Sequence, residues 1–366
     1  MRLAFIDGLR GLFAMLVVIS HFSAFFFEIF PNGFRNSSGS VCGFFVITGF
    51  ILTYKFWLNG TIEPLTSSAL RRYIRLTTMP LVSVLIGYFL FKYHLVFLHE
   101  ACSLTNSAEF MKYYYNFVPH FKDALFEGVI GIYLPFNQMT SFNPVLWTME
   151  YELKGSMFLL AFLALFGKVK NRLPLYIIFI VITAKTLYLT FVFGIMLGDM
   201  MYSAEGKKYY ELLKRKKILS WSAFILGIIF YSYANDSTFF LHSKINSAYF
   251  AQLNWDSEPF YHTLGATLII YSVIQLELLQ KILSLKFFTV LGKYSFSIYV
   301  VHCLALISAG GFIFLTAYNH NFSLMTSTLL GIAAALLVMA LALKPLHNFV
   351  NMPTDRLAKR VSKIFE

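Results

Sequence analysis

The sequence is dominated by long apolar stretches that alternate with short polar and basic segments. Hydrophobic residues occupy 58% of its 366 positions, and charged residues occupy only 13%. A soluble domain carries about 25% charged residues, whereas a helix that crosses a bilayer needs about 20 consecutive, mostly apolar residues. The sequence therefore predicts an all-α fold, a polytopic bundle of transmembrane helices.

The apolar stretches divide into about ten predicted transmembrane helices. The continuous stretch 173–202 is too long for one span and short for two, so we expect a tight helical hairpin there, broken near Lys185. The predicted spans cover approximately 9–29, 41–58, 76–98, 144–166, 173–188, 186–202, 218–234, 262–280, 288–315 and 324–343.

Lysine and arginine are distributed unevenly over the segments that join these spans. With both termini in the cytoplasm, 21 of them fall on the inner side and 6 on the outer side. This asymmetry follows the positive-inside rule and requires an even number of spans. It also explains the net charge of +12 without a nucleic-acid partner. We expect one membrane domain over residues 1–345 and a basic cytoplasmic tail over 346–366.

The sequence also predicts that three features are absent: a cleaved signal peptide, a disulfide framework and a metal site. The first apolar stretch lacks a small-residue cleavage site, so we expect an uncleaved anchor rather than a signal peptide. Three cysteines predict no disulfide framework, and Cys42 and Cys303 read as small apolar fillers of helices. We predict no metal site, because no metal-binding spacing links the remaining histidines considered, His94, His99, His120 and His242.

Arg10 and His21 both lie on the first predicted helix. Eleven residues at a rise of 1.5 Å separate them by about 16 Å, roughly half the hydrocarbon thickness. Ionisable residues at membrane depth are costly unless they face a cavity or a partner. This pair therefore suggests an anion-holding group near the membrane surface and a proton-handling group deep inside.

Five motifs follow one another along the chain. They are Arg10 with His21; Phe44 to Phe50; Arg72 with Arg75; Trp147 and Thr148 with Glu152; and Tyr294, Ser295, Ile298 and Tyr299 with His302. In this order they resemble the motifs of the acyltransferase-3 family of integral membrane O-acyltransferases, over about residues 3–345. Thr48 stands where serine is commoner in that family, and Lys154 departs from its usual neutral or aromatic residue.

The resemblance implies transfer of an acyl group, expected to be acetyl, from acyl-CoA to a hydroxyl of a cell-surface carbohydrate. The acceptor would be O-antigen, capsule or exopolysaccharide, free or lipid-linked, at a bacterial plasma (inner) membrane. Acyl-CoA would be a co-substrate, and we expect no permanently bound cofactor. Such transfer requires a general base for the hydroxyl proton, donors for a developing oxyanion, and cations for the phosphates of coenzyme A.

The motif residues supply these groups. His21 is the expected base, or the residue that takes the acyl group first, and Glu152 would orient that base or the acceptor. Basic side chains would hold the donor phosphates. Trp147 would stack on the substrate, and His302 is a second proton-handling or substrate-binding candidate. The expected donor-binding residues are Arg10, Arg72 and Arg75.

Each role has a structural alternative. Arg10 can also be interpreted as a snorkelling anchor that pairs with Asp7, and the other arginines as ordinary positive-inside charge. His21 and His302 can be interpreted as residues that form hydrogen bonds between helices. Trp147 can be interpreted as a tryptophan at the membrane interface. A rival function is a proton-coupled transporter or flippase of a polar or carbohydrate substrate. The inverted repeats common in transporters are not visible, which favours the enzyme.

Overall fold

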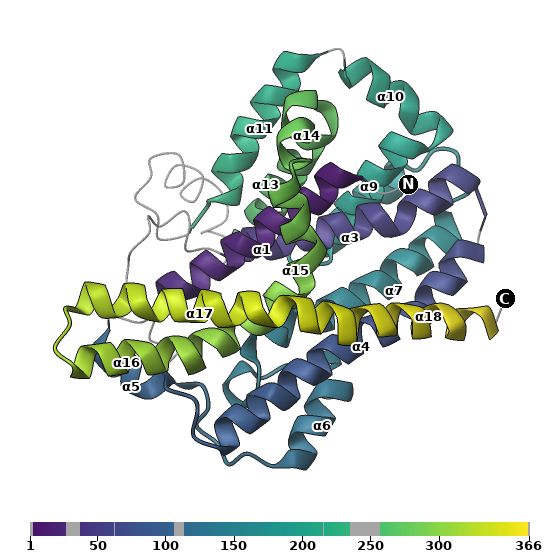
Figure 1. Ribbon diagram of the computed structural model, residues 1–366. Helices are drawn as coiled ribbons and strands as arrows, with labels where there is room; N and C mark the ends of the chain where they lie inside the picture. The colour runs from purple at the N-terminus through teal and green to yellow at the C-terminus, as the bar shows by residue number, and fades with distance from the viewer. Residues whose placement is uncertain are drawn as a thin grey trace. The chain divides into compact units, whose positions relative to one another are not determined.

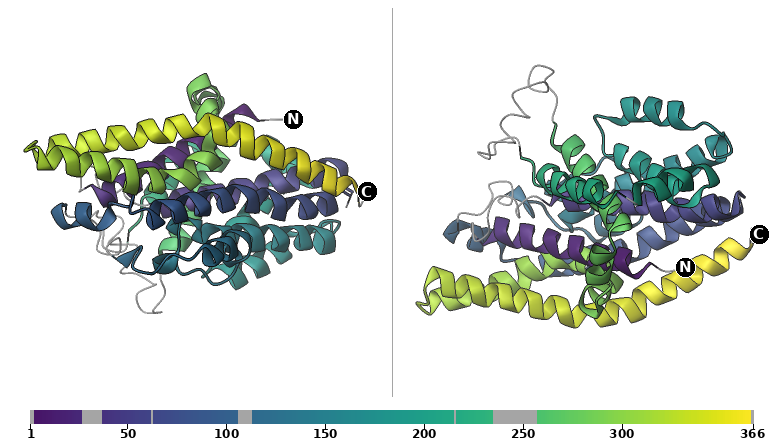
Figure 2. Two further views of the ribbon diagram at one scale, coloured as in Figure 1. Left: turned by 60° about the horizontal axis from the view of Figure 1, so that its bottom comes forward. Right: turned by 90° about the horizontal axis from the view of Figure 1, so that it is seen from above.

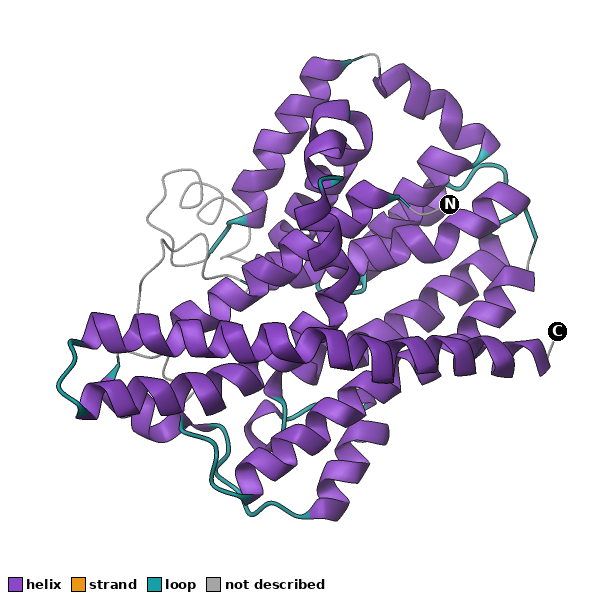
Figure 3. Ribbon diagram, in the orientation of Figure 1, coloured by secondary structure: helices purple, strands orange, loops and turns teal. Residues whose placement is uncertain are grey.

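The computed structural model describes residues 3–26, 37–61, 63–105, 113–214, 216–234 and 257–364. Every regular element in these ranges is a helix, as Figure 3 shows by colour. The predicted all-α class is therefore confirmed for the described part of the chain.

The helices gather in two units that interleave along the sequence. Among the described helices, four pass from one unit into the other: α1 (Ala4–Phe25), α4 (Glu63–Lys92), α7 (Thr148–Phe166) and α15 (Lys286–Ala305). Unit 1 consists of Met1–Phe13, Asn32–Ala69 and Lys154–Lys293, and unit 2 of Ala14–Pro31, Leu70–Leu153 and Tyr294–Glu366.

Small residues allow close helix packing in unit 1. Helices α3 and α9 pack extensively, and a Cβ added to Gly49 would lie 2.9 Å from the Cα of Gly194. Helix α13 packs against both α3 and α11, and α11 and α13 are visible side by side in Figure 1. The helices confined to this unit are α3 (Ser38–Asn59), α8 (Leu173–Thr183), α9 (Leu189–Tyr202), α10 (Ala204–Lys214), α11 (Lys217–Tyr231), α13 (Glu258–Gln275) and α14 (Glu277–Leu283).

Unit 2 combines long helices with short turns. Its own helices are α5 (Leu98–Leu104), α6 (Phe121–Val129), α16 (Gly311–Asn319), α17 (Leu324–Leu346) and α18 (Met352–Ile364). Three 3₁₀ turns, η2 (Gly131–Tyr133), η3 (Gln138–Thr140) and η4 (Pro144–Trp147), shape the segment before α7. Two π-helical turns, η6 (Leu306–Gly310) and η7 (His347–Asn351), join α15 to α16 and α17 to α18.

The predicted count of ten spans is not confirmed. Among the described residues, five helices are long and apolar enough to cross a membrane: Ala4–Phe25, Ser38–Asn59, Leu65–Lys92, Lys286–Asn319 and Leu324–Ile364. The pair α13 and α14, bent by 99°, adds a sixth if it counts as one span. Helices α8, α9 and α11 lie within predicted spans, but with 11, 14 and 15 residues they are short.

One predicted boundary differs from the structure. Helix α4 begins at Glu63, thirteen residues before the predicted span at 76, because arginine and leucine are good helix formers and nothing in this segment interrupts the helix. The arginines expected in an inner loop are therefore helical. Likewise the predicted tail is helical, since α17 continues through η7 into α18, as the long yellow helix in Figure 2 shows.

Candidate functional site

His21 and His302 face each other within unit 2. The Nε2 atom of His302 lies 3.4 Å from the Nδ1 atom of His21, and the ring centroids are 4.9 Å apart at an interplanar angle of 64°. The end of α1 that carries His21 is fixed by the Thr105 hydroxyl, which donates to the carbonyl of Phe25 at 3.1 Å. The first and last predicted motifs thus meet at their histidines.

Backbone hydrogen bonds determine which ring nitrogen of each histidine carries the hydrogen. The Nδ1 atom of His21 lies 2.9 Å from the carbonyl oxygen of Val17, and that of His302 lies 2.7 Å from the carbonyl oxygen of Tyr299. A carbonyl oxygen only accepts, so both Nδ1 atoms are donors and a neutral ring leaves Nε2 with its lone pair. His302 Nε2 then accepts from His21, and His21 Nε2 remains an acceptor that has no partner among the described residues.

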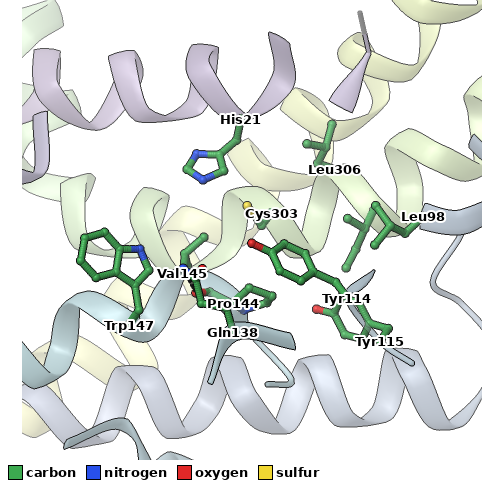
Figure 4. Close-up of a pocket in the computed structure, with 11 residues that line it drawn as sticks. His21, Leu98, Tyr114, Tyr115, Gln138, Pro144, Val145, Trp147, Cys303 and Leu306 are labelled. Atoms are coloured by element: carbon green, nitrogen blue, oxygen red, sulfur yellow. Dashed lines mark hydrogen bonds between the residues drawn. The ribbon is translucent and has the colours of Figure 1, made fainter. Parts of the chain in front are cut away.

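A cavity opens beneath His21, with about 450 Å³ of empty space, part of it open to solvent. Figure 4 shows the His21 ring pointing into it. The lining combines aromatic, amide, thiol and aliphatic side chains, all from unit 2: His21, Leu98, Tyr114, Tyr115, Gln138, Pro144, Val145, Trp147, Cys303, Leu306 and Ile307. His302 is fully buried behind His21 and does not line it. Two lining residues lie on the π-helical turn η6, a feature often found at functional sites.

Buried polar contacts hold the floor of this cavity. The Asn143 side chain donates to Ser83 Oγ at 3.0 Å and to the carbonyl of Val300 at 2.8 Å, which ties the loop before η4 to α4 and α15. The Tyr299 hydroxyl donates to the carbonyl of Val145 at 2.5 Å and contacts the Thr148 hydroxyl at 2.7 Å. The motif residue Tyr299 therefore supports both the cavity floor and, through its carbonyl, His302.

A partly buried carboxylate supports the same loop from α6. Glu127 accepts from the Ser141 hydroxyl at 2.6 Å and from the Phe142 backbone at 3.1 Å. Burial raises the pKa of Glu127, although these two hydrogen bonds act in the opposite direction. The loop conformation thus depends on a carboxyl group that sequence analysis did not single out.

The predicted arginines and glutamate occupy different surroundings. Arg72 forms an ion pair with Glu152, and both side chains are 12% exposed. Arg75 pairs instead with Asp355 of α18 at 2.9 Å, with both side chains about half exposed. The contact that the structure shows for Glu152 is therefore an ion pair with an arginine. Arg10 lies half-buried on the part of α1 that belongs to unit 1 and does not line the cavity.

Sequence analysis missed several cavity residues. Tyr114, Gln138 and Cys303 all line it, yet none belongs to a chemical pattern visible in the sequence. Tyr114 lies in a run of three tyrosines, which gave no reason to prefer one over another. Cys303 was assigned as an apolar filler, and it is indeed buried, but it also borders the cavity.

Three side chains at this point have metal-ligating atoms. Those of His21, His302 and Cys303 lie within 4.8 Å of one another. A metal bound at the facing nitrogens would require the Nδ1 hydrogen of His21 to leave, although that hydrogen is donated to Val17. In the structure the two rings are instead in contact with each other, His302 Nε2 to His21 Nδ1 at 3.4 Å.

Comparison with known proteins agrees with the motif analysis. A family model described as an acyltransferase domain matches residues 3–344. The relative named acyltransferase R4 of Phoma sp. is 22% identical over 388 residues, covering 90% of this chain and 81% of the relative. Acyltransferase clz18 of Cochliobolus lunatus is 23% identical over 382 residues, covering 88% and 80%. No solved structure gives a significant match. The chain therefore belongs to the acyltransferase-3 family of membrane acyltransferases.

Proposed function

We propose that this membrane acyltransferase moves an acyl group, expected to be acetyl, from acyl-CoA to a hydroxyl of a cell-surface carbohydrate. The observation that carries the proposal is the orientation of His21, whose Nε2 lone pair is directed into a cavity while its Nδ1 hydrogen is held from behind. A neutral imidazole in this state is ready to accept a proton near physiological pH.

In the proposed reaction, His21 Nε2 removes the proton of the acceptor hydroxyl as its oxygen attacks the thioester carbon. The resulting imidazolium is stabilised by the Val17 carbonyl and by the buried Nε2 atom of His302, because these two acceptors share the Nδ1 hydrogen of His21. His302 is thus a positioning residue rather than the substrate-binding residue expected from the sequence. Coenzyme A leaves as a thiolate and recovers the proton from His21.

The acceptor would occupy the cavity. Trp147 and Tyr114 offer flat faces for a sugar ring, and Gln138 offers an amide to a hydroxyl. The sugar would belong to O-antigen, capsule or exopolysaccharide, free or lipid-linked, at a bacterial inner membrane, with both termini of the enzyme in the cytoplasm.

The donor phosphates require cations on the cytoplasmic side. Arg72 is occupied by Glu152 in a nearly buried ion pair, so we assign it to holding α4 against α7. Arg75 is half exposed, and its pairing with Asp355 can be exchanged for a phosphate at little cost. Arg75 is therefore the proposed contact for acyl-CoA in unit 2, and Arg10 stays a separate proposal from the sequence.

The test is to compare His21→Ala with His21→Gln in purified protein, using labelled acetyl-CoA and a panel of carbohydrate acceptors. A general base contributes typically 10²–10⁴-fold to the rate, so both variants should lose nearly all transfer at a near-normal melting temperature. An active Gln variant would show that His21 only bridges helices. Failure of the wild-type protein to consume acetyl-CoA would favour the transporter instead.

A further inference from the structure

The proposed transfer places negative charge on the acyl oxygen when the acceptor attacks. Neither histidine supplies a hydrogen for that oxygen in the resting state, because both Nδ1 hydrogens are donated elsewhere and both Nε2 atoms are acceptors. Oxyanion donors usually provide the largest single share of catalysis in acyl transfer. If the enzyme works as proposed, such donors must face the same cavity as His21.

Tyr114 is the first group that meets this requirement. Its hydroxyl points toward the centre of the cavity beside Cys303, as Figure 4 shows. Burial raises the pKa of Tyr114 to about 12, so the hydroxyl keeps its hydrogen throughout the physiological range. The backbone of Tyr114 is fixed by His99, whose Nε2 atom lies 2.8 Å from the Tyr114 carbonyl oxygen.

Trp147 is the second group. Its indole nitrogen is turned toward the cavity, from the side opposite Tyr114 in Figure 4. An indole N–H is only a donor, and this one has no acceptor among the described residues. The ring is supported edge-on by Tyr151, with centroids 5.9 Å apart at 81°. A rigid donor that lacks an acceptor beside a proposed base is suited to a charge that exists only during the reaction.

Two other polar groups of the cavity wall already have acceptors. The Gln138 amide donates to the carbonyl of Pro144 at 3.4 Å, and the Tyr115 hydroxyl donates to the carbonyl of Phe142 at 3.0 Å. Both bonds hold the wall together, and breaking either would leave a buried carbonyl without its donor. These two donors therefore act within the cavity wall itself.

We propose that the Tyr114 hydroxyl and the Trp147 indole N–H form the oxyanion site of the transfer, facing His21 across the cavity. This inference rests on the proposed function. As the acceptor oxygen bonds to the thioester carbon, the carbonyl electrons move to the acyl oxygen, which accepts both hydrogen bonds. The electrons then return, the carbon–sulfur bond breaks, and the thiolate takes the proton that His21 removed from the acceptor.

The experiment measures coenzyme A release from acetyl-CoA by purified Tyr114→Phe and Trp147→Phe variants, with the acceptor that gives the highest wild-type turnover. Each change keeps an aromatic ring and removes one hydrogen. Loss of a single oxyanion donor costs about 10²–10³-fold in kcat, and KM should change little. Tyr133→Phe is the matched control. It removes the hydroxyl of a buried tyrosine that does not line the cavity, and that hydroxyl lies 2.9 Å from the Thr77 hydroxyl.

Fluorinated tyrosines at position 114 separate hydrogen-bond donation from packing. Fluorine makes the hydroxyl a stronger donor with little change in shape, but it also lowers the pKa of the phenol. Among fluorinated tyrosines that stay protonated at the assay pH, kcat should rise with the number of fluorines while the melting temperature stays constant. If the wild-type protein turns over and both Phe variants keep its kcat, the oxyanion site is overturned while the proposed function stands. A kcat that does not change on fluorination has the same meaning. A wild-type protein that releases no coenzyme A with any acceptor overturns the proposed function, and this inference with it.

Discussion

Arg72 and Arg75 are three residues apart on α4, yet the structure gives them contrasting surroundings. Arg72 and its partner Glu152 are each 12% exposed, whereas Arg75 and its partner Asp355 are 53% and 51% exposed. Three residues on an α-helix are separated by about 60° around its axis. That rotation is enough to direct one guanidinium into the packing of unit 2 and the other to its surface. A shared motif therefore does not imply a shared role.

The energetic consequences of the two ion pairs differ accordingly. An exposed pair contributes about 0–1 kcal/mol and is screened by salt, because water solvates both charges nearly as well as they solvate each other. A nearly buried pair contributes little compared with an apolar pair, but removal of one partner leaves an uncompensated charge. The Arg72–Glu152 pair joins α4 to the first turn after Trp147, so its loss should disturb the cavity as well as the stability.

The largest expected effect follows from breaking the buried pair. Replacing Arg72 with Met or Glu152 with Gln leaves one charge without its partner, and such changes cost about 3–5 kcal/mol in unfolding free energy. Both variants should therefore melt at a clearly lower temperature and lose activity together with stability. Thermal unfolding in detergent and transfer from acetyl-CoA, measured on the same samples, check this.

Charge exchange distinguishes structural pairing from a direct role of Glu152. The double variant Arg72→Glu with Glu152→Arg restores opposite charges at the two positions and should recover much of the lost stability. Activity should return in parallel if the carboxylate acts only through the ion pair. A Glu152→Gln protein that is inactive at a normal melting temperature would contradict this assignment and return Glu152 to the reacting groups.

The sequence was sufficient for the fold class and the family, and for selecting two histidines that the structure places together. Apolar runs predict helices reliably because a membrane allows few alternatives. The spacing of His21 and His302 within their motifs pointed to chemistry, and the structure brings the two rings into contact. These inferences depend on local pattern, which the chain carries in full.

The remaining features depend on tertiary context. Arg72 and Arg75 looked equivalent because partners 80 and 280 residues away decide their surroundings. Tyr114 could not be chosen from Tyr113–Tyr115, because the backbone decides which of the three rings line the cavity, and Tyr114 and Tyr115 both do. Tyr115 adopts a φ of 59°, in the left-handed region that only a few per cent of non-glycine residues occupy. No local propensity predicts that conformation.

Glu127 extends the comparison to a carboxyl that is held by hydrogen bonds instead of an arginine. Burial raises its pKa in the folded protein, so the folded state binds this proton more tightly than the unfolded chain. Its contribution to stability is full below the unfolded value of about 4.3 and declines as the pH rises through the raised folded value. Glu127→Gln should remove that decline, as melting temperatures between acidic and neutral pH will show.

The matched control for this pH dependence lies on the same helix. Asp123 is exposed in the first turn of α6, and Asp123→Asn should leave the pH dependence of the melting temperature as in the wild type. Gln can still accept from the Phe142 backbone and donate to Ser141, so the loop should keep its conformation. A decline that persists unchanged in Glu127→Gln would assign it to other groups.

The smallest effect on stability is expected at the exposed pair. Arg75→Ala should lower the unfolding free energy by no more than about 1 kcal/mol, and added salt should reduce even that difference. Its effect on acyl-CoA should be larger, because charge-assisted hydrogen bonds contribute about 1.5–3 kcal/mol each, which corresponds to at least about a tenfold loss in affinity. Asp355→Asn provides the opposite change, since it releases Arg75 from its partner and should strengthen acetyl-CoA binding. If neither variant alters the affinity for acetyl-CoA, Arg75 only contributes to the positive charge of the cytoplasmic side. Arg72 and Arg75 would then differ only in their effect on the unfolding free energy.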